Sequence, residues 1–256
     1  MAGRRTTGPK STGSHRVRLW LIWTGLIAVG LILALLLAGL GYVLSLPSVA
    51  NAEARVLETI TSHHGEVGGL PVPSRLSRAV VAVEDEHFYS PVFVNVFDGF
   101  ARATLASVTA NGDPGGSTID QQLAKQLYGE GPGWGALLRD VGLGVKLAVS
   151  YSRSQILAMY LNVVYYGNHY WGDVAAARGY FGLAPNRLSW AQAAMLAGLP
   201  QAPSAYDAVH HLALARERQL HVLNQLVANH DLTRAQARAA YRLPLKLRAK
   251  TTASAH

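Results

Sequence analysis

GGSTIDQQLAK, residues 115–125, is the stretch of this sequence that says most about its fold. Two glycines followed by a serine and a threonine describe a loop that enters a helix, with either hydroxyl able to cap it. In a helix, Ser117, Gln121 and Lys125 share one face. A hydroxyl, an amide and an ammonium at a helix N-terminus suit a sugar pyrophosphate. A capped amphipathic surface helix is the alternative, and these residues alone do not decide between the two.

A second informative stretch is EDEHFY, residues 84–89, which ends the apolar helical segment Ala79–Val83. Adjacent carboxylates beside apolar side chains can have raised pKa values. Such a group suits a base that takes a proton from a sugar hydroxyl. The alternative interpretation is a solvated acidic helix end.

The N-terminal region predicts a membrane anchor. Residues 1–18 form a basic, flexible tail without acidic residues, and residues 19–46 carry no charge. The apolar run exceeds the roughly 20 residues that a helix needs to cross the hydrocarbon core, so we expect one transmembrane helix. The preceding positive charges predict a cytoplasmic N-terminus, with everything after Pro47 outside. A signal peptide cleaved near residues 50–52 is the alternative, although its apolar region would be shorter.

The rest of the chain reads as helical. We expect one domain over residues 47–245 and a basic tail over 246–256. Apolar residues recur every three or four positions in four stretches, Leu76–Val83, Leu137–Val149, Ile156–Val164 and Leu220–Val227. Ser154 and Thr233 stand where N-caps would begin helices. The basic stretch 234–250 is expected to be a solvated helix and tail, or a membrane-surface element.

Composition bounds the function. The formal charge of +8 makes the surface attractive to polyanions, which include nucleic acids, anionic lipids and pyrophosphates. The chain has no cysteine, so disulfides and thiolate metal sites are excluded. The histidine pairs 63–64 and 210–211 lack the spacing and carboxylate company of a metal site, and we interpret them as surface histidines.

Two motifs resemble those of the biosynthetic peptidoglycan glycosyltransferases, which include monofunctional enzymes and the transglycosylase domain of bifunctional penicillin-binding proteins. The family's first motif is Glu-Asp-x-x-Phe-x-x-His, and its second is Gly-x-Ser-Thr-x-x-Gln-Gln-x-x-Lys. The matching positions are Glu84, Asp85, Phe88, Gly115, Ser117, Thr118, Gln121, Gln122 and Lys125. The similarity continues through residues 151–167, 175–182 and 193–207, and it covers nearly all of the chain beyond residue 47.

The resemblance implies a mainly α-helical, lysozyme-like domain preceded by a single transmembrane helix. It implies an enzyme that polymerises lipid II into β-1,4-linked glycan strands and releases undecaprenyl pyrophosphate by an inverting mechanism. Glu84 would be the general base. The second-motif residues, with Asp85 and Phe88, would bind substrate, and a divalent cation such as Mg²⁺ or Mn²⁺ would assist. The expected partners are lipid II, the growing strand and other wall-synthesis proteins at the bacterial cytoplasmic membrane.

The third motif of the family, Arg-Lys-x-x-Glu, is only partly kept. Its carboxylate falls on Asp140, which the resemblance makes a second catalytic residue beside Glu84. Its Arg-Lys pair falls on Ala136 and Leu137, so cationic help in binding substrate is expected from Arg139, Lys146 or elsewhere. The departures from the family pattern stand at Pro91, Ala136, Asp120, Gln126 and Asp140 and in the apolar stretch 92–97. An acidic residue at 120 should repel a pyrophosphate unless it faces away or binds a cation.

Three other functions remain to be weighed. The departures favour a catalytically weakened homologue that binds lipid-linked glycan or acts as a scaffold. A lysozyme-like hydrolase would not need the pyrophosphate site, and nucleic-acid binding would not explain the membrane helix. No Ser-x-x-Lys or Lys-Thr-Gly motif of a penicillin-binding transpeptidase occurs, so we expect a monofunctional enzyme.

Overall fold

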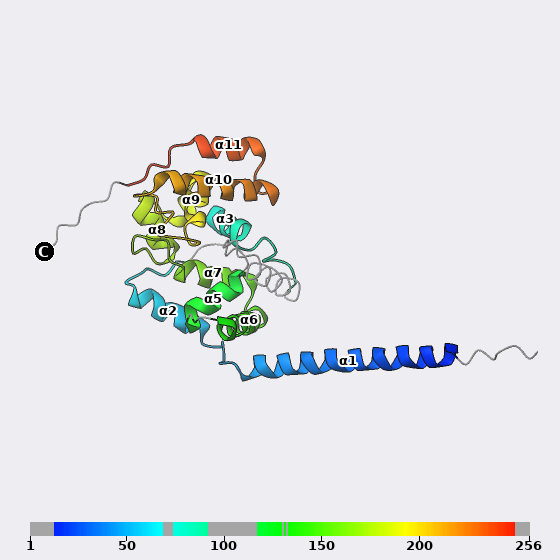
Figure 1. Ribbon diagram of the computed structural model, residues 1–256. Coiled ribbons are helices and arrows are strands. Elements are labelled where there is room, and N and C mark those ends of the chain that lie inside the picture. Colours follow the sequence, from blue (N-terminus) through cyan, green and yellow to red (C-terminus); the bar gives the residue numbers. More distant parts are fainter. Residues whose placement is uncertain (1–12, 69–73, 92–116, 130, 132, 249–256) are drawn as a thin grey trace, which may run out of the picture. The chain divides into compact units, whose positions relative to one another are not determined.

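The computed structural model of this protein describes residues 13–68, 74–91, 117–129, 131 and 133–248, with backbone alone over 13–19. The chain divides into two compact units, with the boundary between Leu46 and Pro47. The first contains one helix, α1 (Gly13–Ser45), drawn in blue in Figure 1. Its segment Trp20–Ser45, 26 residues, is long and apolar enough to cross a membrane by length and composition. Most of the two predicted basic tails, residues 1–18 and 246–256, and all of the apolar stretch 92–97 lie outside the described residues.

The second unit is built from helices. Their bounds are α2 (Ala52–Ser62), α3 (Arg75–Glu84), α5 (Ile119–Tyr128), α6 (Gly133–Ser150), α7 (Arg153–Val163), α8 (Gly172–Phe181), the 3₁₀ turn η1 (Pro185–Arg187), α9 (Trp190–Gly198), α10 (Leu212–Ala228) and α11 (Arg234–Arg242). Within the described ranges, the one β feature is an isolated antiparallel bridge between Tyr165 and Trp171. The four stretches with helical periodicity lie on α3, α6, α7 and α10, and only Val164 falls beyond its helix.

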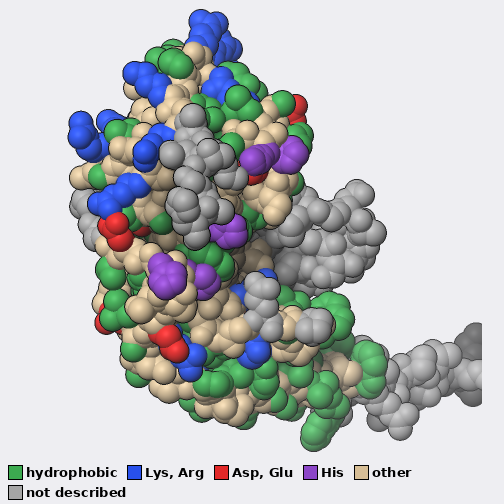
Figure 2. All heavy atoms as spheres, turned by 90° about the vertical axis from the view of Figure 1, so that its left-hand side faces the viewer, with side chains coloured by type: hydrophobic (Ala, Val, Ile, Leu, Met, Phe, Trp, Pro, Cys, Tyr) green, Lys and Arg blue, Asp and Glu red, His purple; other side chains and the backbone are tan. Residues whose placement is uncertain are grey.

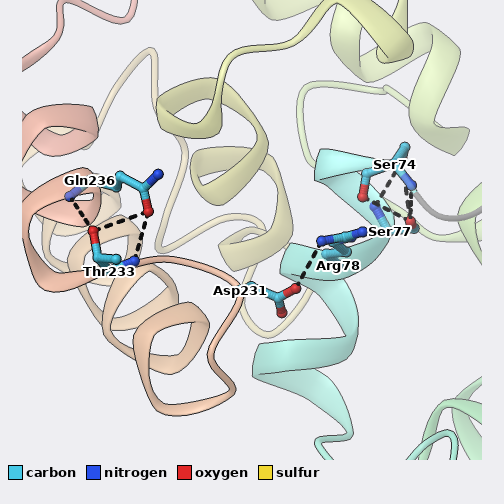
Figure 3. Close-up of polar contacts among 6 residues, drawn as sticks. All are labelled: Ser74, Ser77, Arg78, Asp231, Thr233 and Gln236. Atoms are coloured by element: carbon cyan, nitrogen blue, oxygen red, sulfur yellow. Dashed lines mark hydrogen bonds and ion pairs between the residues drawn. The ribbon is translucent and has the colours of Figure 1, made fainter.

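Five helices begin with a reciprocal capping box. In each, a serine or threonine hydroxyl accepts the backbone N–H three residues later, and that residue's side chain accepts the N–H of the cap. The caps are Ser74, Thr118, Ser152, Ser189 and Thr233. Figure 3 shows two of them, on α3 and α11. Each contributes about 1 kcal/mol to its helix.

The predicted cap at Thr233 is therefore confirmed, and the one at Ser154 is wrong. Ser152 begins α7 instead, because Gln155 stands three residues after it and closes the box.

Two groups of packed helices form the core. In one, α9 packs against α3 and α10, and all of α9 beyond Trp190 is buried. In the other, α5 packs against α6 and α7. An ion pair between Arg78 and Asp231, 3.3 Å apart, joins α3 to the turn between α10 and α11 (Figure 3). The end of α3 and the start of α5 come from different groups, and the candidate site lies where they meet.

Candidate active site

Asp85 connects the two sequence motifs. Helix α3 ends at Glu84, and the side chain of Asp85, its C-cap residue, is buried. Its Oδ2 accepts the backbone N–H of Ile119 at 3.2 Å. Ile119 is the first residue of α5, where an N–H has no partner within the helix and the helix dipole favours negative charge. Residues 84–85 and the start of α5 are thus held together although 34 positions separate the bonded pair.

A chain of hydrogen bonds then fixes the carboxylate of Glu84. Its Oε2 accepts from Nε2 of Gln122 at 2.7 Å. The hydroxyl of Tyr160, which is fully buried on α7, donates to Oε1 of Gln122 at 2.9 Å. Because that amide oxygen already accepts a hydrogen bond, the amide nitrogen is the end that faces Glu84.

The surroundings of Glu84 favour a basic carboxylate. Burial raises the pKa of Glu84 above its usual value, and the Gln122 hydrogen bond and the charge of Arg218 act in the opposite direction. Its Oε1 is shielded from solvent, and no described residue gives it a hydrogen bond. One oxygen is therefore held in place, and the other has the capacity to accept a proton.

A pocket of about 500 Å³ adjoins this arrangement. Its lining residues are Gln122, Lys125, Gln126, Gly129, Val164, Tyr165, Trp171, Pro200 and Pro203. Gln122 borders the pocket and also bonds to Glu84, so this side chain links the carboxylate to the pocket wall. No ion pair joins Lys125 to a carboxylate among residues that the structure describes. Two aromatic residues, Tyr165 and Trp171, also line the pocket, with their ring centroids 4.8 Å apart.

The predicted shared face is wrong for Ser117, whereas Gln121 and Lys125 lie four residues apart on α5. Thr118 is the N-cap, so Ser117 precedes the helix. Gln121 is buried and its side chain accepts the N–H of Thr118 at 3.3 Å. It also packs on α6, where a Cβ at Gly144 would lie 3.3 Å from its Cγ. The face of α5 that borders the pocket instead carries Gln122 and Lys125, three residues apart.

Asp120 does not stand unpaired beside a pyrophosphate site. It is buried, and both of its carboxylate oxygens accept from Nη1 of Arg153 at 2.8 Å. Burial raises the pKa of Asp120 to about 6, and the arginine opposes this shift. The repulsion expected from its sequence position is therefore offset by a cation on α7.

The third-motif residues lie on α6. The buried Asp140 accepts from the guanidinium of Arg139 at 3.3 Å, and Arg139 also donates to the backbone oxygen of Gly129, a residue of the pocket. Lys146 donates to the backbone oxygen of Pro47 at 3.2 Å. Of the two predicted cations, Arg139 contacts a residue of the pocket, and Lys146 contacts Pro47, which is not a pocket residue. Substrate contacts of all three residues stay predictions.

Phe88 and Pro91 follow the first motif. Phe88 is fully buried, and the guanidinium of Arg153 lies 5.2 Å from its ring centroid. Phe88 packs in the core, and the buried Thr118 caps α5. Burial does not favour direct contact of either side chain with substrate, and their substrate contacts stay predictions. Pro91 is exposed, and Gly115 of the second motif lies outside the described ranges.

Sequence reasoning missed Tyr160 and Arg153. Tyr160 is a polar group in the apolar run of α7, and a buried hydroxyl normally has a partner, which was the available signal. The signal for Arg153 was Asp120 itself, because a carboxylate on a buried helix face needs a cation. Neither partner could be identified from spacing along the chain.

A buried acid outside this arrangement gives the fold a pH dependence. Asp173, in the first turn of α8, has no described hydrogen-bond partner for either carboxylate oxygen. Burial raises its pKa to about 7; nearby backbone N–H groups oppose this without reaching hydrogen-bond geometry.

We expect Asp173→Asn to remove a pH-dependent part of the stability. Because the pKa of Asp173 is raised in the folded state, folding favours its protonated form. The stability that Asp173 contributes relative to Asn is therefore at its maximum below about pH 4. It is lost as the pH rises through about 7, by up to roughly 4 kcal/mol. Thermal unfolding of both proteins from pH 4 to 8 measures it, and a constant difference in free energy would contradict it.

The chain is similar in sequence to known proteins. The pattern of the transglycosylase family matches residues 54–227. A protein of Cupriavidus necator, provisionally named a transglycosylase, is 32% identical over 235 residues, covering 90% of this chain and 99% of that protein. Penicillin-binding protein 1A of Neisseria flavescens is 36% identical over 222 residues, covering 81% of this chain. This chain spans 28% of the length of that relative.

A crystal structure of penicillin-binding protein 1A from Haemophilus influenzae matches 71% of this chain and 18% of its own, with 22% identity and a TM-score of 0.43. The transglycosylase domain is a lysozyme-like helical fold, and the predicted fold class, a mainly α-helical domain after an N-terminal apolar helix, is confirmed. The match over residues 54–227 spans most of the 256-residue chain and includes both motifs that meet at Glu84. The chain belongs to the transglycosylase family.

Proposed function

We propose that this protein polymerises lipid II into β-1,4-linked glycan strands and releases undecaprenyl pyrophosphate. Glycosyltransferase activity on peptidoglycan is the function of its family, and the proposal adds the substrate and the chemistry. The observation that carries it is the 2.7 Å hydrogen bond between Glu84 and Gln122, on the side of α5 that borders the pocket with Lys125. A base and a cation beside one cavity are what a transfer from a pyrophosphate donor requires.

In the proposed reaction, Glu84 is the general base. The Glu84 carboxylate accepts the proton of the acceptor sugar's 4-hydroxyl while the hydroxyl oxygen attacks the anomeric carbon of the donor. The new C–O bond forms on the face opposite the leaving group, so the configuration inverts. The bond between the anomeric carbon and the pyrophosphate breaks, and the pyrophosphate leaves with its electron pair. The raised pKa of Glu84 strengthens the base, provided that the working pH keeps it ionised.

The departing pyrophosphate needs positive charge. Lys125 lines the pocket and is the proposed first partner, because an ammonium aimed at developing negative charge lowers the barrier. Arg139, whose guanidinium bonds to Gly129 at the end of α5, is the proposed second one. Substrate binding by Ser117, Thr118, Gln121, Gln122 and Asp85 remains part of the proposal.

A divalent cation is proposed as an aid bound mainly by the substrate. The described residues contain no group of three or more His, Asp or Glu that could hold a metal ion. Asp120 and Asp140 both face arginines, so neither fits a dedicated metal site as the structure stands. Mg²⁺ commonly binds through substrate phosphates and one or two carboxylates, and it would screen pyrophosphate charge if present. No step above depends on it.

We propose that α1 anchors the enzyme in the bacterial cytoplasmic membrane. Its apolar segment has the required length, and the basic residues before it favour a cytoplasmic N-terminus with the catalytic domain outside. We further propose a monofunctional enzyme that works with other wall-synthesis proteins.

Polymerisation of lipid II tests this proposal. Purified full-length protein in detergent, with a divalent cation, should convert labelled lipid II into glycan strands, and moenomycin should block the reaction. Strand formation with release of undecaprenyl pyrophosphate supports a transferase. Tight binding of lipid II without turnover would instead support a binding or scaffolding homologue, and new reducing ends from finished peptidoglycan would support a hydrolase.

We expect Lys125→Gln to lower kcat by about ten- to a hundredfold. This loss is smaller than for a hydrogen-bond donor in a water-excluded active site, because solvent reaches the pocket and screens the charge of Lys125. The matched control is Lys246→Gln, which makes the same chemical change at an exposed position. Initial rates of lipid II consumption measure the effect, and equal rates for the two variants would remove Lys125 from the mechanism.

A further inference from the structure

A groove between α10 and α11 has no part in the chemistry above. Its volume is about 640 Å³. Apolar side chains of α10, including Leu220 and Val227, line one wall, and three arginines of α11, with Tyr241, line the other. The arginines are Arg234, Arg238 and Arg242, which recur every fourth residue and so share one face of the helix. The groove therefore combines an apolar wall with a regular row of positive charge.

The row of arginines is not neutralised within the described chain. All three are exposed, and no ion pair or hydrogen bond joins their side chains to another described residue. The acids of residues 212–248 are Glu217 and Asp231, and Asp231 already pairs with Arg78. Figure 2 shows Lys and Arg side chains gathered at the upper end of the domain, where Figure 1 places α10 and α11.

The walls of the groove are fixed before any partner binds. The guanidinium of Arg216, on α10, lies 4.1 Å from the ring centroid of Tyr241, on α11, and also donates to the backbone oxygen of that residue. Gln219 accepts from Arg216 at 2.9 Å, and the buried amide of Gln219 donates to the backbone oxygen of Ala191 on α9. A preformed site loses less conformational entropy when it binds a ligand.

The surface of α11 does not favour insertion into a lipid surface. A helix that lies in the membrane interface presents large apolar or aromatic side chains outward. The exposed residues from Thr233 to Arg242 are polar or alanine, and Leu220 and Val227 of α10 line the groove between the two helices. The shape fits a helix laid into a groove, one of the recurring modes of peptide recognition.

We propose that this groove binds an acidic amphipathic helix of a partner protein. Residues four apart on a helix are about 6 Å apart along its axis, so glutamates at every fourth position of the guest would face the three arginines. Apolar residues of the guest would cover Leu220 and Val227. The row from Arg234 to Arg242 is about 12 Å long and accommodates two to three turns.

A designed peptide tests the proposal. The probe is a labelled helix of about 14 residues with glutamate at every fourth position beside an apolar stripe, and its partner is the full-length protein in zwitterionic nanodiscs. We expect fluorescence anisotropy to show saturable binding above empty nanodiscs. Arg238→Gln with Arg242→Gln should weaken it by about five- to twentyfold, in the range for two exposed charge pairs.

The control is Arg187→Gln with Lys246→Gln, which removes the same charge elsewhere and should weaken binding by less than about twofold. A scrambled peptide of identical composition should bind at least about fivefold more weakly, because it lacks the stripe. Equal losses of peptide affinity in both double variants, or equal binding of the scrambled peptide, would overturn the proposal that the groove binds a helix. If the protein binds anionic vesicles in a way that depends on Arg238 and Arg242 but does not bind the peptide, the proposed helix is wrong and the ligand of this surface is an anionic lipid surface. Polymerisation of lipid II should be unchanged in both double variants, so this result is separate from the proposed function.

Discussion

Glu84→Gln is expected to reduce the rate of lipid II polymerisation by at least about a hundredfold and up to about ten thousandfold, the usual range for loss of a general base. The amide cannot take a proton from the acceptor hydroxyl, yet its oxygen can still accept the hydrogen bond from Gln122. The fold should therefore survive, and thermal unfolding of the variant checks this. Single-turnover rates with saturating lipid II separate the chemical step from binding.

The matched control is Glu86→Gln, two residues further along and exposed. It should keep activity within about twofold, as expected for a surface substitution away from the reacting groups. The wild-type rate should rise with pH as Glu84 ionises. Because burial raises the pKa of Glu84, the midpoint of this rising limb should lie at a higher pH than for an ordinary carboxyl group. That limb should be absent from the residual rate of Glu84→Gln. Wild-type turnover by Glu84→Gln would show that another group is the base.

Local patterns predicted the helices well because helix formation depends on near neighbours. The periodicity of Leu137–Val149 and Leu220–Val227 marks the faces that pack, and tertiary contacts do not change that spacing. Caps were harder only where two hydroxyls compete. At Ser152 and Ser154 the decision rests on Gln155, which completes a box with the first serine alone.

The same local rule explains the error at the second motif. Thr118 has Gln121 three residues later, so the side chain of Gln121 serves the cap. Once the helix begins at Ile119, the face that borders the pocket is shifted to Gln122 and Lys125. A capping analysis of this segment would have excluded Ser117 from the helix from sequence alone.

Contacts between distant segments could not be predicted from one sequence. The bond from Gln122 to Glu84 spans 38 positions, and the pairing of Asp120 with Arg153 spans 33. The first depends on where the end of α3 meets α5, and the second on how α5 packs against α7. Hydrophobic periodicity specifies neither. The resemblance to a family supplied the candidate site residues, and the structure supplied the arginine partners of Asp120 and Asp140.

Arg153→Met should destabilise the protein by about 3–5 kcal/mol, because it leaves the carboxylate of Asp120 buried without its cation. The cost should be largest above about pH 6 and should shrink at lower pH, where Asp120 becomes neutral. Adding Asp120→Asn should recover most of the loss, since no charge then remains to be compensated. Equilibrium unfolding of the single and double variants at pH 5 and pH 8 measures both effects as a double-mutant cycle.

Arg78→Met provides the matched comparison, because it breaks an ion pair with Asp231 whose partners are partly exposed at 47% and 23%. That pair should contribute no more than about 1 kcal/mol. If Arg153→Met costs no more than Arg78→Met, or if Asp120→Asn fails to rescue it, the carboxylate at position 120 is not compensated by Arg153. The repulsion of pyrophosphate expected from its sequence position would then stand, and turnover by this chain would have to overcome it. A large cost with rescue would show instead that Asp120 and Arg153 act as one neutral structural unit behind the pocket face of α5.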